Sequence, residues 1–213
     1  MMKALIIGAT GATGKDLVDV LLSDPEYKEV VVFVRRPSGI THPKLTEIIT
    51  DYNKLEDVSA QINGDVWFSC LGTTLKTAGS KEAQYQIDYE IPAKFAAIAK
   101  RNGVSRLVLL SSYGASATSR VFYSRMKGQL EEHLASLAFD LHIIFRPGLL
   151  LRKNTDRLGE QLSAGALKFF NSIGLLRKLR PLPTSTLAEK MAKAPKIFSE
   201  GLHFVEPAKI WEL

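Results

Sequence analysis

The 213-residue sequence contains one cysteine, four histidines and no long apolar run. A single cysteine, Cys70, excludes an internal disulfide and a zinc site built from several thiolates. The histidines lack the spacing of metal ligands, so we predict no bound metal. No stretch reaches the roughly 20 apolar residues of a membrane-spanning helix. The first residues do not form a cationic leader before a long apolar segment. These absences predict a cytoplasmic protein without an integral membrane segment.

The sequence also lacks internal repeats, low-complexity tracts and a clear linker. Apolar residues make up 46% of the chain and charged residues 23%, which is typical of a soluble globular protein. A chain of this length can bury a sizeable core. We therefore expect residues 1–213 to form a single domain.

The net charge of +6 comes from the last third of the chain. Residues 1–140 hold 16 basic and 16 acidic side chains, whereas residues 141–213 hold 12 and 6. A basic surface attracts nucleic acid, anionic lipid or phosphorylated ligands. No nucleic-acid-binding motif accompanies this charge. We interpret it as a solvated face near an anionic cofactor and expect no nucleic-acid partner; binding to an anionic surface is the weaker alternative.

Short apolar runs rich in β-branched residues alternate with patterns typical of amphipathic helices. This alternation predicts an α/β fold: a doubly wound, Rossmann-like parallel sheet with helices on both faces. Residues 146–200 are expected to form a small C-terminal extension that covers the substrate side. The expected strands are residues 3–8, 29–34, 46–50, 65–70, 106–111 and 141–145, and the expected helices are residues 13–23, 54–61, 82–102, 120–138, 157–171 and 186–198.

Residues 3–14 read KALIIGATGATG and are the most informative stretch of the chain. An apolar run stops at Gly8, Gly11 and Gly14 follow at intervals of three, and a helical pattern then begins. Glycines in such a turn let the backbone approach a pyrophosphate, and the helix N-terminus offers free N–H groups and the positive end of its dipole. The pattern predicts a dinucleotide-binding turn. The alternative is an ordinary tight turn between a strand and a helix.

The second expected strand ends in VVFVRRP. Domains that bind NAD usually place an acidic residue here, which accepts hydrogen bonds from the adenosine ribose. This chain has Arg35 and Arg36 instead, and guanidinium groups pair well with a phosphate. The pair therefore favours NADP(H), the alternative being a solvated charged turn. Asp51, after the third strand, is expected either to contact the adenine or to cap the next helix.

The fourth expected strand ends in FSCLGTT. Leu71, Gly72 and Thr73 are expected to run close under the cofactor, because glycine allows a near approach of the backbone.

The fifth expected strand ends in Ser111 and Ser112, and a helical pattern follows. In that helix Tyr123 and Lys127 lie four residues apart, so their side chains share one face. In a doubly wound sheet the strand end and the start of the next helix lie beside the cofactor crevice. This position favours a reactive pair over the alternative, an ordinary pair on the helix surface.

Three of these stretches, GATGATG, LLSSYGAS and YSRMK, resemble the glycine motif, the serine and the Tyr-x-x-x-Lys pair of short-chain dehydrogenases/reductases. With VVFVRRP and FSCLGTT, they are similar to the atypical branch of that family that includes the Tat-interacting protein. The similarity runs from the N-terminus through Arg146-Pro147-Gly148 and, more weakly, to the C-terminal end.

The resemblance implies a hydride-transfer site in which the protein orients the nicotinamide and handles the proton. Tyr123 would be the acid/base, and Lys127 would favour its phenolate form and hold the ribose hydroxyls. Ser112, preferred to Ser111, would hydrogen-bond the substrate oxygen. The resemblance places Thr10, Gly11, Ala12 and Thr13 at the phosphates, Arg35 and Arg36 at the 2′-phosphate, Leu71, Gly72 and Thr73 along the cofactor, and Pro147 and Gly148 on the nicotinamide side.

Two features lie outside this match. Asp88 stands where many short-chain enzymes have an asparagine that serves a proton relay, so the resemblance leaves a relay open. The stretch LSAGALKFFNSIGLLRKLRPLP mixes apolar and basic residues and is expected to form a lid over the substrate. A helix lying on a membrane surface is the alternative.

These observations predict an NADP(H)-dependent oxidoreductase that acts on a small-molecule carbonyl or alcohol of unidentified structure. The alternative is a non-catalytic regulator that senses NADPH and recruits a protein partner, since some members of the branch are discussed as regulatory. Both hypotheses need the glycine turn and the two arginines. Only the enzyme needs Tyr123 and Lys127 as a reacting pair. The sequence leaves the oligomeric state open.

Overall fold

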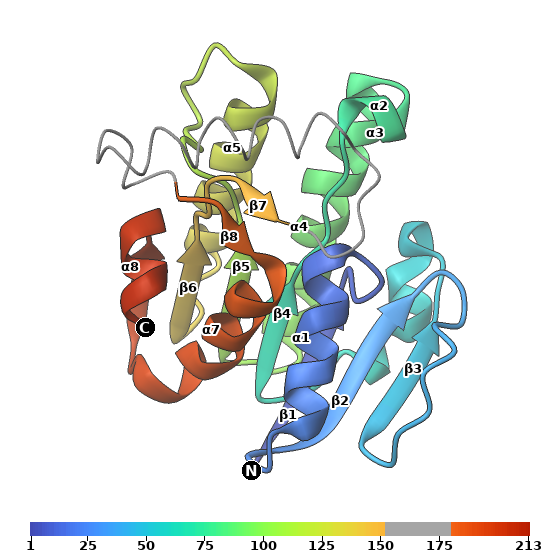
Figure 1. Cartoon of the computed structure of the whole chain (residues 1–213). Coiled ribbons are helices and arrows are strands. Elements are labelled where there is room, and N and C mark those ends of the chain that lie inside the picture. Colours follow the sequence, from blue (N-terminus) through green and yellow to red (C-terminus); the bar gives the residue numbers. More distant parts are fainter. Residues whose placement is uncertain (152–179) are drawn as a thin grey trace.

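Seven parallel strands form the central sheet of the computed structural model, which describes residues 1–151 and 180–213 (Figure 1). The strand order is β3-β2-β1-β4-β5-β6-β9, so the sheet grows outwards from β1 in both directions. This is the doubly wound Rossmann-like arrangement, and the predicted fold class is confirmed. The strands are β1 (Met2–Ile7), β2 (Tyr27–Val34), β3 (Leu45–Ile49), β4 (Val66–Ser69), β5 (Arg106–Leu110), β6 (Leu141–Phe145) and β9 (Gly201–Val205).

Helices cover both faces of the sheet. One layer holds α1 (Ala12–Ser23), α7 (Thr184–Ile197) and α8 (Pro207–Glu212). The other holds the 3₁₀ helix η1 (Tyr52–Gln61), α4 (Ile91–Arg101) and α5 (Phe122–Ser136). Ala4 and Ile6 of β1 pack into the first layer, and Leu5 and Ile7 pack into the second. Central strands are therefore apolar on both faces, and this explains the continuous runs in the sequence.

A structural strand lies at each of the six ranges expected from the sequence. The sequence analysis missed β9, the helices α8 and α2 (Leu75–Ala78), and a separate pair of two-residue strands, β7 (Leu150–Leu151) and β8 (Leu182–Pro183). The helix expected at 54–61 is the 3₁₀ helix η1. The helix expected at 82–102 consists of α3 (Lys81–Tyr85), a π-helical turn η2 (Gln86–Glu90) and α4.

The expected substrate-side cover, residues 146–200, is only partly described. Helix α7 packs beside α1 in a main layer of the fold, whereas β7 lies at the carboxyl ends of the sheet strands (Figure 1). The expected helix at 157–171 lies outside the described residues, as does most of the expected lid. In the part of the chain that is described, no helix is both long and apolar enough to cross a membrane.

Candidate active site

The turn between β1 and α1 is held together by contacts that only glycine permits. Gly8 has a φ of +80°, and a Cβ on it would lie 2.5 Å from the backbone of Cys70 and Leu71. A Cβ on Gly14 would lie 2.1 Å from the carbonyl oxygen of Gly8. The first glycine therefore lets the ends of β1 and β4 meet, and the last lets α1 press onto the turn.

Helix α1 presents an open N-terminus at this turn. Gly11 is its N-cap residue, so no side chain caps the first turn, and no acidic residue lies in that turn. Its carbonyl oxygen accepts the N–H of Lys15 at 2.9 Å, which closes the first helical turn. The free N–H groups and the positive end of the helix dipole suit an anionic group.

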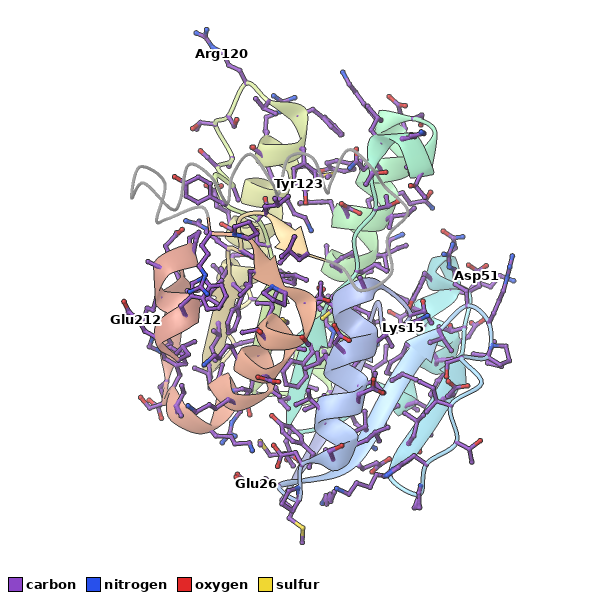
Figure 2. The ribbon with its side chains drawn as sticks, in the orientation of Figure 1. Lys15, Glu26, Asp51, Arg120, Tyr123 and Glu212 are labelled. Atoms are coloured by element: carbon purple, nitrogen blue, oxygen red, sulfur yellow. The ribbon has the colours of Figure 1, made fainter. Side chains whose placement is uncertain are left out.

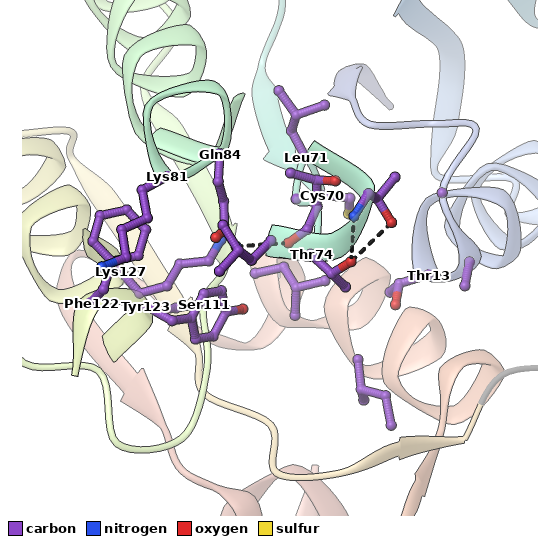
Figure 3. A pocket seen from close by; sticks show the side chains of 18 of the residues that line it. Thr13, Cys70, Leu71, Thr74, Lys81, Gln84, Ser111, Phe122, Tyr123 and Lys127 are labelled. Carbon is purple, nitrogen blue, oxygen red and sulfur yellow. Dashed lines mark hydrogen bonds between the residues drawn. The ribbon is translucent and has the colours of Figure 1, made fainter. Parts of the chain in front are cut away.

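A cavity of about 690 Å³ opens beside this N-terminus (Figure 3). It lies at the carboxyl ends of the strands, the side of the molecule on which Figure 2 shows Tyr123 and Asp51, with Glu26 at the opposite end. Among the described residues that line it, none is acidic, and the charged ones are lysines. The lining consists of Gly11, Ala12, Thr13, Cys70, Leu71, Gly72, Thr73, Thr74, Leu75, Thr77, Lys81, Gln84, Leu110, Ser111, Val121, Phe122, Tyr123, Lys127 and Leu150.

The predicted pair on α5 lies on the cavity wall. Tyr123 is in the first turn of the helix and is 39% exposed, whereas Lys127, one turn later, is 3% exposed. The next residue, Gly128, brings α5 against the loop after β5, since a Cβ there would lie 2.2 Å from the backbone of Ser116 and Ala117. The loop thus fixes the helix that carries both side chains.

A buried carboxylate lies below the cavity floor. Asp88 is fully buried, and its Oδ1 accepts the N–H of Thr73 at 2.7 Å. A Cβ on Gly72 would lie 3.9 Å from both Asp88 Oδ2 and Lys127 Nζ, so both side chains reach the backbone of this glycine. Oδ2 has no hydrogen-bond partner among the described residues. Burial raises the pKa of Asp88, while the Lys127 ammonium and the Thr73 N–H act in the opposite direction.

The π-helical turn η2 accounts for the position of Asp88. Such turns are rare and occur often at functional sites. One helical turn earlier, the buried side chain of Gln84 donates to the carbonyl oxygen of Thr73 at 3.2 Å. Asp88 and Gln84 therefore bind the backbone N–H and the carbonyl oxygen of Thr73 and fix the backbone that runs along the cavity. The sequence analysis missed Gln84, although its four-residue spacing from Asp88 was a usable signal.

The two serines at the end of β5 differ in their surroundings. Ser111 lines the cavity, but its hydroxyl donates a short hydrogen bond to the buried carboxylate of Glu131. Glu131 also pairs with Arg146, which in turn pairs with Glu206. The Ser112 hydroxyl is buried without a hydrogen-bond partner among the described residues, and Ser112 is absent from the cavity lining. Neighbouring residues of an extended chain point in opposite directions, which separates the two side chains.

Comparison with known proteins identifies the family. A model of a family described as NAD(P)H-binding matches residues 8–169. This chain belongs to the NAD(P)H-binding family. It is 34% identical over 224 residues to "Protein FMP52-1, mitochondrial" of Scheffersomyces stipitis, covering all of this chain and 98% of that protein. It is 35% identical over 173 residues to "Protein HTATIP2" of Rattus norvegicus, covering 79% of this chain and 70% of that protein. The resemblance to atypical short-chain dehydrogenases/reductases of the Tat-interacting protein branch is confirmed.

Solved structures share the fold of this NAD(P)H-binding protein. The oxidoreductase ylbE from Lactococcus lactis has a TM-score of 0.70 at 17% identity, with 100% of this chain and 96% of that chain covered. A short-chain dehydrogenase/reductase superfamily protein from Agrobacterium tumefaciens, solved with bound NAD, has a TM-score of 0.72 at 16% identity, with 99% and 80% covered. At these identities the likeness concerns the fold alone.

The expected cytoplasmic location is wrong. Relatives from Scheffersomyces stipitis, Candida albicans and Saccharomyces cerevisiae are all named mitochondrial. The expectation rested on the low cysteine count and on the lack of a secretion-type leader and of a membrane-spanning run, and these features do not distinguish the cytoplasm from another reducing compartment.

The described residues of this NAD(P)H-binding protein fit a nicotinamide dinucleotide. The uncapped N-terminus of α1 and the backbone around Gly72 line one continuous cavity. Arg35 and Arg36 follow β2 directly, are exposed, and form no ion pair with another described residue. Asp51 caps η1, because its carboxylate accepts the N–H of Asn53 at 2.9 Å. Of the two roles considered for Asp51, capping is therefore the one that its contacts display.

Other predicted cofactor residues lie outside the cavity lining. Pro147 follows β6, and its carbonyl oxygen accepts the N–H of Tyr113 at 2.9 Å. The predicted residues that the structure does not bring to the cavity wall are Gly8, Thr10, Gly14, Arg35, Arg36, Asp51, Ser112, Pro147 and Gly148. The wall residues that the sequence analysis missed include Thr74, Thr77, Lys81, Gln84 and Phe122, which come from the loop after β4, from α2 and α3, and from the start of α5.

Proposed function

We propose that this chain is an NADP(H)-dependent oxidoreductase that interconverts a carbonyl and an alcohol. The observation that carries the proposal is the position of the Tyr123–Lys127 pair on the same cavity as the open N-terminus of α1. A phosphate-binding end and a proton-transferring end on one cavity are what a nicotinamide-dependent reduction requires.

The amino-terminal turn would hold the cofactor, with residues 10–13 at the phosphates and the glycines Gly8 and Gly14 keeping the backbone close. Arg35 and Arg36 would pair with the 2′-phosphate of the adenosine ribose, which supports NADP(H) over NAD(H). Residues 71–73 would run along the cofactor, and Pro147 and Gly148 would border the nicotinamide. When bound, the cofactor supplies the hydride.

The side chains of α5 would handle the proton. In the reductive direction the Tyr123 hydroxyl would donate its proton to the carbonyl oxygen of the substrate. The Lys127 ammonium would stabilise the phenolate that forms, and its burial strengthens this interaction because water is excluded. Lys127 would also donate hydrogen bonds to the ribose hydroxyls. Asp88, below the same floor, would hold Lys127 in place.

A serine hydroxyl would stabilise the substrate oxygen as charge develops on it. We keep Ser112 in this role, since its hydroxyl has no partner among the described residues, whereas that of Ser111 is bonded to Glu131. The role requires Ser112 to turn towards the cavity when substrate binds. If Ser111→Ala lowers turnover far more than Ser112→Ala, the roles of the two serines are reversed.

The test is a calorimetric titration with NADPH and with NADH, followed by turnover assays on a panel of aldehydes and ketones. The proposal expects tighter binding of NADPH than of NADH, together with loss of NADPH absorbance in the presence of at least one carbonyl compound. Binding of NADPH without turnover of any compound would favour a regulator that senses the cofactor. Three exposed apolar side chains at the cavity, Leu75, Val121 and Tyr123, would then be available to a protein partner.

We propose a mitochondrial location for this chain, following the names of its fungal relatives. Fractionation of cells that express the unaltered chain tests this, with the protein expected to sediment with mitochondria and to resist protease until the membranes are opened.

A further inference from the structure

The cavity holds a second cation that the proposed reaction does not use. Lys81 and Lys127 are the charged residues among the described lining, and the reaction assigns Lys127 to the cofactor ribose and to Tyr123. Lys81 is exposed and forms no ion pair with another described residue. Its neighbour Glu82 is absent from the lining, so the cavity has positive charge without an acidic counterpart there.

Lys81 lies close to the reactive end of the cavity. It is the first residue of α3, and its Nζ lies 5.6 Å from the ring centroid of Phe122. Phe122 precedes Tyr123 at the start of α5, and both line the cavity. Figure 3 shows Lys81 extending towards Phe122 in the part of the cavity that holds Tyr123 and Lys127. A cation that contacts this ring is held near the position where the substrate would react.

Much of the cavity lining is apolar. Val121 and Phe122 form it on the α5 side, and Leu110 and Leu150 come from the strand ends. Hydroxyls are present on the α2 side, where Thr74 Oγ1 and Thr77 Oγ1 lie 2.9 Å apart. A ligand that spans this cavity meets apolar side chains along its body, with the Lys81 ammonium at the Phe122 side.

We infer that the substrate is a carbonyl compound with an apolar body and an anionic group, and that Lys81 binds that group. This inference rests on the proposed function, because Tyr123 fixes where the carbonyl lies. The anionic group is a carboxylate or a phosphate, since an ammonium pairs with either. The inference makes Lys81 a determinant of specificity and gives it no part in the proton transfer.

The test compares three aldehydes that share one aromatic body: 4-carboxybenzaldehyde, its methyl ester, and 4-formylphenyl phosphate. Calorimetry with the NADP⁺-bound full-length chain measures binding, since an aldehyde is not reduced in that complex. We expect an anionic aldehyde to bind at least about tenfold more tightly than the ester. Lys81→Met should remove this preference, and Lys81→Arg should keep it. The phosphate and the acid, compared with each other, identify which anion is preferred.

Lys76→Met is the matched control, because Lys76 lies on the neighbouring helix α2, is exposed, and is absent from the cavity lining. It should leave the preference unchanged. Equal affinity for the ester and both anions, or an anion preference that survives Lys81→Met, would overturn the inference. So would the absence of measurable binding by either anionic aldehyde.

Turnover separates this inference from the proposed function. NADPH-dependent reduction of all three aldehydes at equal kcat/KM would leave the oxidoreductase intact and remove the role of Lys81. Binding that depends on Lys81, without reduction of any probe or panel compound, would support the anion site and count against the oxidoreductase.

Discussion

The two ends of the cavity differ in whether backbone groups or side chains form them. The end proposed to hold the cofactor, here the cofactor end, is made of backbone: three glycines, an uncapped helix N-terminus, and a contact between the ends of β1 and β4 that leaves no room for a Cβ. The end proposed to hold the reacting groups, here the reactive end, is made of side chains from α3, η2 and α5, among them the buried Lys127 and Asp88. A backbone site follows from local sequence. A side-chain site depends on how separate helices meet, so the two ends should respond differently to substitution.

Tyr123→Phe should have the largest effect and should act on the reactive end alone. Loss of the hydroxyl removes the proton donor, so kcat should fall about 10²- to 10⁴-fold, while the Kd for NADPH should change little. Turnover and calorimetry on the same preparation measure both. Tyr113→Phe is the control, since Tyr113 is exposed and is absent from the cavity lining. Unchanged turnover in Tyr123→Phe would refute the assignment of Tyr123 as the acid/base.

Gly14→Ala should distort the turn between β1 and α1, at the cofactor end of the cavity. The new Cβ would lie 2.1 Å from the carbonyl oxygen of Gly8, so α1 must move away from the turn. We expect the free energy of unfolding to fall by about 3 kcal/mol and NADPH affinity to fall with it. Gly11→Ala is the graded control, because its Cβ would lie 3.3 Å from the same oxygen. Equal stability of the two variants in urea unfolding would contradict this account of the turn.

Arg35→Ala tests whether a side chain at the cofactor end distinguishes NADPH from NADH. Loss of a charge-assisted contact to the 2′-phosphate should weaken NADPH binding about tenfold and leave NADH binding nearly unchanged. Arg120→Ala is the control, because it removes the same charge from a side chain that points away from the molecule (Figure 2). It should change neither the affinity for NADPH nor the affinity for NADH. A parallel loss of NADPH and NADH affinity in Arg35→Ala would count against recognition of the 2′-phosphate.

Asp88→Asn should have the smallest effect, visible as a change in pH dependence. Burial raises the pKa of Asp88 above its usual 3.8, so the folded chain holds this proton more tightly than the unfolded chain. The stabilisation is present below about pH 4 and is lost as the pH rises through the folded-state pKa. Asparagine at position 88 is neutral at every pH, so the variant does not lose this stabilisation as the pH rises. Between pH 4 and 7 the unfolding free energy of the variant, relative to wild type, should therefore increase with pH.

Glu90→Gln is the control for this effect, because Glu90 belongs to the same π-helical turn and is exposed. Its pH profile of unfolding should follow that of wild type. Identical profiles for Asp88→Asn and wild type would show that Asp88 does not carry the proton expected of it.

The same contrast explains what the sequence could predict. Val30 to Val34 form one apolar run because helices cover both faces of β2, so the strand could be recognised without knowledge of its neighbours. Strand β9 was missed because it lies at the sheet edge, where Leu202 and Phe204 stay partly exposed and the apolar signal is weak. The glycine turn could be recognised because its three glycines lie within seven consecutive residues, between an apolar run and a helical pattern.

The side-chain end could be predicted only in part. The Tyr123–Lys127 spacing is local to one helix, and the two residues do share the cavity. The position of Asp88 depends on a π-helical turn, for which the sequence pattern gives no warning. Whether Ser111 or Ser112 faces the cavity depends on one step of an extended chain. Lys81 reaches the wall only because α3 and α5 begin beside the same cavity.

The ion pairs of Arg146 link the C-terminal residues to helix α5, which carries Tyr123. Its guanidinium joins Glu131, on the helix that carries Tyr123, to Glu206, which directly precedes α8. The carboxylate of Glu131 is almost wholly shielded from water. Loss of Arg146 would therefore leave a buried negative charge without a cationic partner, which destabilises the fold. The C-terminal residues therefore help to hold α5 in position. A truncation that begins before Glu206 would remove one ion pair of Arg146 and make Tyr123, more than eighty residues away, less firmly positioned.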